Sequence, residues 1–278
     1  MKLHSVPVAG GALAVEELPG STQPVLAVHG VSSQRRLWSW LRAEAPEISL
    51  VAPDLRGRAD SVDVQGPSSM AQHAEDLVAV LDALGLDAVH VVGMSMGGFV
   101  AVHLAHLHPE RVKSLVLVDG GFPMAAPPGL TVEMLPVVFK DRLDRLEQRW
   151  DSLDDYLAFF TSSTAPLLDP ADPLLREYLA HDLRDGLVRL SGQALLDDAA
   201  DIYLNETPWQ SLTQPIRFSH AQWASGAGTS PAYPEEALRT YLPATVSSRY
   251  VEGQDHAGSI MTKAGAVAAA ELLTEALG

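Results

Sequence analysis

The chain has 278 residues, of which 47% are hydrophobic, enough for one large α/β domain or for a core with a smaller insertion. It carries 19 basic and 35 acidic residues, a formal net charge of −16. This balance argues against nucleic acid or an anionic membrane as a partner, because both require a basic face. Cysteine is absent, which excludes disulfides, thiolate zinc sites and cysteine nucleophiles.

The sequence predicts a cytoplasmic enzyme. Residues 1–7 carry one positive charge and are not followed by a long apolar stretch, so a signal peptide is not expected. Uninterrupted apolar runs stay below the roughly eighteen residues that a transmembrane helix needs, so no membrane span is expected either.

Short apolar runs alternate with helical periodicity through the first part of the chain. The expected strands are residues 25–28, 48–52, 88–92 and 114–118. A helix is expected between Ser69 and Leu84, with Gly85 as its stop, and another begins near Gly98. This alternation predicts an α/β fold with a mostly parallel, doubly wound sheet that helices cover on both faces.

The pattern changes after Phe122. Prolines interrupt regular structure there, and the chain to about Asn205 reads as helical and charged without strand-like runs. We interpret residues 123–205 as a helical cap inserted into a core of residues 1–122 and 206–278. Aromatic residues of this segment could line a substrate pocket, although packing against one another is the favoured use. They are Phe139, Trp150, Tyr156, Phe159 and Phe160.

Strand and helix patterns return after the cap. The expected strands are 213–219 and 247–251, and the expected helices contain residues 235–241 and 264–277.

A turn with one serine follows the strand at 88–92. Gly93-Met94-Ser95-Met96-Gly97 has the pattern G-x-S-x-G, in which the chain reverses so sharply that the serine is strained and glycines avoid collisions. Such a pentapeptide can also be an ordinary loop, but the flanking strand and helix favour a nucleophile elbow. The hydroxyl reacts only if a histidine and a carboxylate elsewhere activate it.

Four motifs in this order resemble the α/β-hydrolase family across nearly the whole chain. They are His29-Gly30, the run from Ala52 to Gly57, the elbow, and Gly253-Gln254-Asp255-His256. The resemblance implies a serine hydrolase with an eight-stranded core and a lid. A serine at the elbow excludes the haloalkane dehalogenases and epoxide hydrolases of this fold, which use an aspartate there.

The resemblance also implies roles for individual residues. Ser95 is the expected nucleophile, and His256 is the expected general base because it alone of ten histidines lies in a loop after a late strand. The family pattern places the oxyanion hole at the backbone N–H groups of Val31 and Met96. His29 is expected to be structural and to shape the oxyanion loop.

Three further histidines fall in or just after the elbow helix. His103, His106 and His108 have a spacing that could bind a metal, but no carboxylate cluster accompanies them. Packing or surface roles are therefore favoured, and no metal is expected.

The triad acid departs from the commonest form of the family, which carries an aspartate after the penultimate strand. Between Thr213 and Pro234 there is neither Asp nor Glu. Asp119 ends the strand after the elbow helix, and some branches of the family place their acid there. Asp119 is the predicted acid, with a structural aspartate as the alternative. Asp255, next to His256, and Glu235 are the reserves.

The expected function is therefore a cofactor-free serine hydrolase for an ester or lactone of a mainly apolar small molecule. Four arginines could instead bind a substrate carboxylate or phosphate, although surface positions are favoured. They are Arg35, Arg36, Arg56 and Arg58. Carbon–carbon bond hydrolysis, perhydrolysis and a ligand receptor with little turnover remain alternatives, and the oligomeric state is left open.

Overall fold

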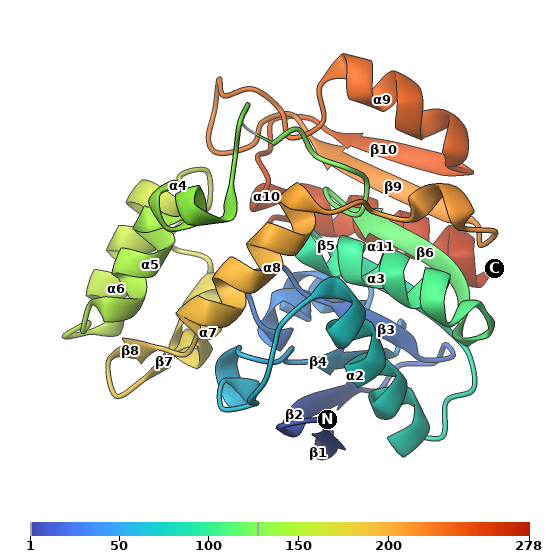
Figure 1. The fold of residues 1–278 in the computed structure, drawn as a ribbon, viewed down its shortest axis with the longest axis horizontal. Coiled ribbons are helices and arrows are strands. Elements are labelled where there is room, and N and C mark those ends of the chain that lie inside the picture. Colours follow the sequence, from blue (N-terminus) through green and yellow to red (C-terminus); the bar gives the residue numbers. More distant parts are fainter. Residues whose placement is uncertain (1, 127) are drawn as a thin grey trace.

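The computed structural model describes residues 2–126 and 128–278, so Met1 and Pro127 lie outside the described residues. Its centre is an eight-stranded sheet in the order β1-β2-β4-β3-β5-β6-β9-β10 (Figure 1). Strands β4 to β10 in this order run parallel, whereas β2 is antiparallel to both of its neighbours, β4 and β1. The strands are β1 (Lys2–Val8), β2 (Gly11–Leu18), β3 (Val25–Val28), β4 (Leu50–Pro53), β5 (Val89–Met94), β6 (Val112–Val118), β9 (Ile216–Ala221) and β10 (Ser247–Val251).

Helices cover both faces of the sheet, which confirms the predicted doubly wound architecture. Side chains of β6 alternate between two apolar clusters: Val116 and Val118 pack with α1 and α11, and Leu115 and Leu117 pack with α2 and α3. Because both faces are buried there, the central strands β3 and β4 are continuous apolar runs. The helices are α1 (Ser39–Glu44), α2 (Met70–Ala83), α3 (Met96–Leu107), α9 (Glu235–Tyr241), α10 (Gly258–Met261) and α11 (Lys263–Leu277).

Helix α2 shows how local sequence sets an element's limits. The hydroxyl of Ser69 accepts a hydrogen bond from the Gln72 N–H and caps the first turn. Gly85, which follows the C-terminal residue Leu84, has φ +66°, the left-handed conformation that glycine adopts without strain. Both limits agree with the sequence prediction.

Residues 123–205, which we call the cap segment, lie at the side of the sheet (Figure 1, left). Its helices are α4 (Leu135–Val138), α5 (Lys140–Glu147), α6 (Leu153–Phe159), α7 (Pro173–Asp182) and α8 (Gly192–Leu204). The prediction that this segment lacks strands is wrong, because β7 (Leu183–Arg184) pairs with β8 (Leu187–Val188). The turn between them is Asp185-Gly186, with φ of 52° and 75°, the dipeptide that two-residue hairpins prefer.

The aromatic residues of the cap segment pack mainly against one another. Trp150 lies 5.0 Å from Tyr156 and 4.9 Å from Phe159 between ring centroids. Phe139 and Phe160 are also buried. The packing interpretation of these rings therefore holds.

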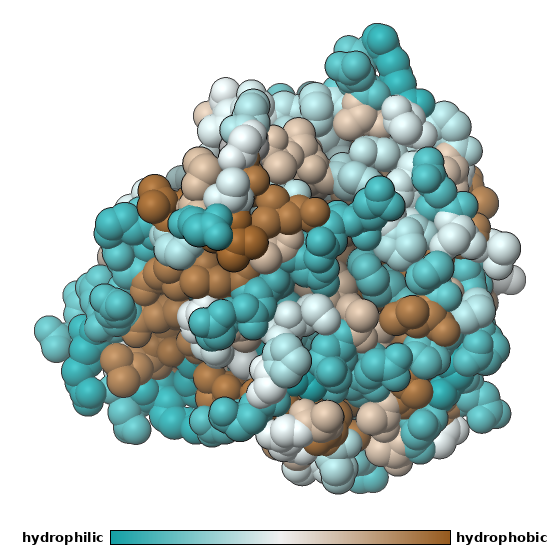
Figure 2. Space-filling model, viewed as in Figure 1, coloured by the Kyte–Doolittle hydropathy of each residue, from teal (hydrophilic) through white to brown (hydrophobic). Residues whose placement is uncertain are grey.

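Several apolar residues of the cap segment are exposed, and Figure 2 shows apolar surface gathered over this part of the molecule. The exposed members are Val132, Met134, Val137 and Val138. None of the helices in residues 2–126 and 128–278 combines the length and apolar character needed to cross a membrane.

Candidate active site

Ser95 occupies a strained turn between β5 and α3. Its φ of 54° and ψ of −122° lie outside the regions that residues with a side chain favour, at a cost of about 1–3 kcal/mol. Glycine is required on both sides of it. A Cβ on Gly97 would lie 1.9 Å from the Val28 carbonyl oxygen, and one on Gly93 would lie 2.2 Å from the Gly97 oxygen. The turn therefore holds the serine at the carboxyl end of a central strand, half-buried.

Two loops lie directly against Ser95. A Cβ on Gly120, after β6, would approach the Ser95 carbonyl oxygen to 2.2 Å, and one on Gly30, after β3, would approach the Ser95 Cβ to 3.3 Å. Absence of a side chain at these glycines lets both loops close on the serine. They bring Asp119 and Val31 into the same region.

Asp119 and His256 form a hydrogen bond of 2.6 Å between Oδ2 and Nδ1. The second oxygen of Asp119, Oδ1, accepts the Ala221 N–H at 3.1 Å. Asp119 is 1% exposed, whereas the His256 side chain is 29% exposed. Because an ionised carboxylate only accepts, the imidazole proton lies on Nδ1 and leaves Nε2 as the basic nitrogen.

The two reserve carboxylates are bound to other partners. Asp255 is buried and accepts the N–H groups of Gly226 at 2.9 Å and Gly258 at 3.0 Å, so it joins two loops. Glu235 has an 81% exposed side chain and pairs with Arg239 in the same helix.

The loop after β3 is ordered by His29. This residue is fully buried, and burial lowers its pKa to about 4, so the ring is neutral at pH 7. Its Nε2 accepts the Leu55 N–H at 2.9 Å, and Nδ1 therefore donates to the Gly30 carbonyl at 2.8 Å. That carbonyl belongs to the same peptide group as the Val31 N–H, so its position fixes where the N–H points.

Met96, whose N–H is the other predicted oxyanion donor, is the first residue of α3. N–H groups in the first turn of a helix have no partner within the helix and lie at its positive end. Met96 is buried and Val31 is half-buried.

The expectation that the four arginines lie at the surface is wrong for three of them. Arg35, Arg56 and Arg58 are buried. Their carboxylate partners are Glu16, Asp54 and Asp60 for Arg35, Asp76 for Arg56 and Asp198 for Arg58. The partners lie 19 to 140 residues away, so a local pattern does not reveal them. Arg36 is partly exposed and lies 3.5 Å from Glu16.

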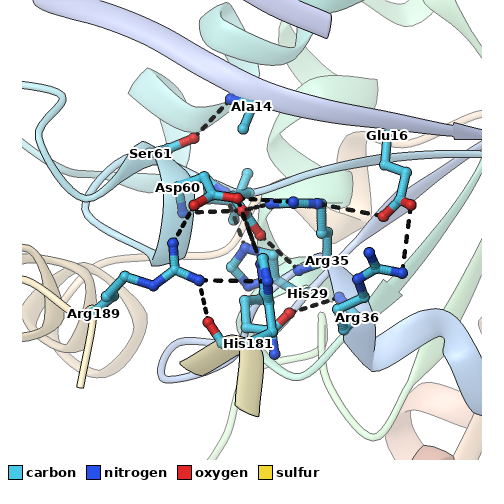
Figure 3. Close-up of polar contacts among 12 residues, drawn as sticks. Ala14, Glu16, His29, Arg35, Arg36, Asp60, Ser61, His181 and Arg189 are labelled. Atoms are coloured by element: carbon cyan, nitrogen blue, oxygen red, sulfur yellow. Dashed lines mark hydrogen bonds and ion pairs between the residues drawn. The ribbon is translucent and has the colours of Figure 1, made fainter. Parts of the chain in front are cut away.

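Figure 3 shows that Arg35 and Arg189 both point toward the carboxylate of Asp60, beside His181 and His29. In the described part of the chain, Asp54, Asp60 and His181 are the group whose ligand atoms lie within 4.8 Å of one another. The guanidinium groups of Arg35, Arg184 and Arg189 already bind these carboxylates, which disfavours a cation there.

The three histidines of the elbow helix do not converge. His103 bonds the Phe99 carbonyl at 2.9 Å, and His106 bonds the Ser211 hydroxyl at 2.7 Å. His108 bonds Glu75 at 2.9 Å. They therefore have the packing and surface roles that the sequence favours.

Two surface hollows of about 440 Å³ and 430 Å³ lie elsewhere on the molecule. The first is lined by His103, His106, residues 206–208 and residues 210–211, and the second by residues at and just after the end of α1 and by residues of β10 and α11. Ser95, Asp119 and His256 line neither of them.

Comparisons with known proteins consistently point to one fold. Residues 23–149 match the family model of the alpha/beta hydrolase fold. Lipase LipV of Mycobacterium tuberculosis (strain ATCC 25618 / H37Rv) is 42% identical over 101 residues, which are 36% of this chain and 38% of that lipase. The chain matches only about a third to two fifths of the length of such curated relatives.

Solved structures resemble the chain over its full length. A thermophilic esterase from Thermogutta terrifontis with malate bound covers 100% of both chains at 20% identity, with a TM-score of 0.71. E-2-(acetamidomethylene)succinate hydrolase covers 99% of this chain and 98% of its own at 19% identity, with a TM-score of 0.78. Together with the sheet order and the elbow, these matches show that the chain has the α/β-hydrolase fold.

Proposed function

We propose that this chain is a serine hydrolase that cleaves a carboxylic ester or lactone of a mainly apolar small molecule. The observation that carries the proposal is the 2.6 Å hydrogen bond between Asp119 and His256, in a site whose loops close on a strained Ser95. A buried acid, an imidazole that bonds this acid through Nδ1 and keeps Nε2 as its basic nitrogen, and a serine at an elbow are the parts that acyl transfer needs.

In the proposed mechanism, Nε2 of His256 removes the proton of the Ser95 hydroxyl as its oxygen attacks the substrate carbonyl carbon. The Asp119 carboxylate stabilises the imidazolium that forms. The carbonyl oxygen becomes an oxyanion, which the N–H groups of Val31 and Met96 bind; each such donor is typically worth about 10²- to 10³-fold in turnover. His256 then protonates the leaving alkoxide, and a water activated by the same nitrogen releases the acid.

Two observations support a mainly apolar, uncharged substrate. Arg35, Arg56 and Arg58 already have buried carboxylate partners, so they are not available for a substrate anion. Apolar residues of the cap segment, such as Leu135 and Leu195, share one cluster with residues of the sheet such as Met94. We propose that residues 123–205 form a cap over the site, and relatives named lipase and esterase agree with this substrate class.

The experiment combines a fluorophosphonate probe with a series of p-nitrophenyl esters, lactones and thioesters. We expect a covalent adduct on Ser95, found by mass spectrometry of peptides, together with steady turnover of at least one ester or lactone. An adduct on another serine would refute the proposal. Rapid labelling of Ser95 with negligible turnover of every ester would favour the ligand receptor instead.

A further inference from the structure

Arg58 contacts both residues whose backbone N–H groups are proposed to form the oxyanion hole. Its Nε and Nη2 both donate to the Val31 carbonyl oxygen, each at 3.0 Å. Its Nη2 also lies 3.8 Å from the Met96 sulfur. Nη1 donates to the Arg56 carbonyl at 2.8 Å. The Arg58 side chain is completely buried, so it does not reach substrate.

The cap segment holds Arg58 from the other side. Asp198, in α8, accepts Arg58 Nη2 on its Oδ2 at 2.6 Å, and it too is completely buried. His73 of α2 bonds the same oxygen at 3.0 Å. Burial favours the neutral form of Asp198, but the nearby His73 and Arg58 outweigh it and lower its pKa to about 2, so the carboxylate is ionised.

Backbone contacts join the same two segments. Ala59 N–H donates to the Arg189 carbonyl at 2.7 Å, and Ser191 N–H donates to the Gly57 carbonyl at 2.8 Å. Arg58 and Leu190 thus form an antiparallel bridge immediately before α8. The chain on both sides of Arg58 is therefore fixed to the start of α8.

The two peptide groups that flank the Val31 Cα are both held through their carbonyls. His29 holds the Gly30 carbonyl, and Arg58 holds the Val31 carbonyl with a forked pair of hydrogen bonds. Two fixed peptide planes leave Val31 little freedom in φ and ψ, and so fix the direction of its N–H. A small misplacement of a catalytic group lowers rates strongly.

We propose that Arg58 is a positioning residue for the oxyanion hole and that Asp198 of α8 holds it in place. The docking of the cap segment on the core thereby sets the geometry of the Val31 N–H. This inference rests on the proposed hydrolase function and adds to it a link between cap and transition state. A buried ion pair is by itself weak evidence for stability, because an apolar pair of similar volume is often as stable. The two hydrogen bonds from Arg58 to the Val31 carbonyl give this pair a function other than stability, namely orienting the Val31 N–H.

The test compares two variants of the pair with a control pair. Arg58→Lys keeps the charge but loses the fork, and Asp198→Asn keeps the shape but weakens the hold on Arg58. The control is Asp76→Asn, because Asp76 forms an equally buried pair with Arg56, at 2.7 Å, that does not bond Val31. Thermal unfolding of each variant shows that it is folded under the assay conditions.

The readout is the ratio of kcat/KM for an ester to that for its thionoester, whose sulfur is a poor ligand for an oxyanion hole. We expect Arg58→Lys and Asp198→Asn to lower kcat for the ester about tenfold or more, with KM little changed, and to lower the ratio in parallel. Asp76→Asn should leave the ratio unchanged. If one variant fails to fold, the other decides.

Two outcomes separate this inference from the function on which it rests. A folded variant whose ester-to-thionoester ratio equals that of the unaltered protein would overturn the role of Arg58, while Ser95 labelling and turnover would leave the hydrolase proposal standing. Absence of Ser95 labelling and of turnover in the unaltered protein would refute the function, and the inference with it.

Discussion

Replacing Asp119 by asparagine exchanges one carboxylate oxygen for an amide nitrogen and leaves the shape of the side chain almost unchanged. The carboxylate accepts two hydrogen bonds, from the Ala221 N–H at 3.1 Å and from His256 Nδ1 at 2.6 Å. An amide has a single accepting oxygen, so asparagine accepts only one of these two bonds.

The effect on the protonation of His256 depends on whether the asparagine oxygen keeps its hydrogen bond to Ala221 or the one to His256. If the amide oxygen stays with Ala221, the NH₂ group faces Nδ1, and the imidazole must carry its proton on Nε2 in order to accept. Nε2 is then unable to take the proton of Ser95. Turnover should fall roughly 10⁴-fold, as when a triad acid becomes its amide. At 1.36 kcal/mol per factor of ten, this is a loss of about 5 kcal/mol of transition-state stabilisation.

The assay measures kcat and KM for a p-nitrophenyl ester and thermal unfolding by circular dichroism. KM should change little, because Asp119 is 1% exposed and reaches the substrate only through His256. Two control variants should cost far less turnover: Glu235→Gln, at an exposed position, and Asp255→Asn, which removes a partner of two backbone amides and should mainly lower stability. A folded Asp119→Asn protein with kcat within about tenfold of the original would refute this assignment of the acid.

Three further predictions follow from the same site. Ser95→Ala should keep the fold and lower turnover about 10⁶-fold, with phosphonate labelling abolished; residual labelling would point to another nucleophile. Burial holds the folded pKa of His29 at about 4, below its unfolded value, so the unfolded chain binds the extra proton between roughly pH 6.5 and 4. The contribution of His29 to the free energy of unfolding, about 3 kcal/mol, is complete above that pH window and is lost as pH falls through it. Over this window, urea unfolding of a folded His29→Asn variant should show a smaller loss of stability than the original protein, and an equal loss would contradict the reasoning. Gly120→Ala places a Cβ 2.2 Å from the Ser95 carbonyl oxygen and should lower the free energy of unfolding by about 1–3 kcal/mol or more. The control Gly192→Ala, whose Cβ has its nearest neighbour at 3.4 Å, should not lower it. Equal melting temperatures for the two variants would contradict this prediction.

Features encoded in short stretches of sequence could be predicted. The strands at 25–28 and 247–251 have the predicted limits, because each is a compact run between turn residues. The elbow could be recognised because its glycines are required by close backbone approaches, of Gly97 to Val28 and of Gly93 to Gly97. The position of Asp119 at a strand end follows from the order of parallel strands, and the structure adds the hydrogen bond that a sequence does not show.

Features that depend on contacts between distant segments could not be predicted. Strand β1 has little apolar alternation by which a sequence could reveal it, because most of its residues are exposed at the sheet edge. The burial of Arg58 depends on Asp198, 140 residues away, and its charge taken alone favours the surface. In the small hairpin β7-β8, each strand has only two residues, too few to show an alternating apolar pattern in the sequence. Asp185-Gly186 is nevertheless a usable turn signal.

The antiparallel bridge between Arg58 and Leu190 has a consequence for how substrate enters. Lifting α8 from the core would break two backbone hydrogen bonds and separate the buried ion pair of Arg58 and Asp198. Helix α8 is therefore expected to behave as the fixed side of the entrance. Opening motions should instead involve the first half of the cap segment, around α4, whose short helix leaves Val137 and Val138 exposed to solvent. Hydrogen exchange should accordingly be slow at the start of α8 and fast in residues 132–138.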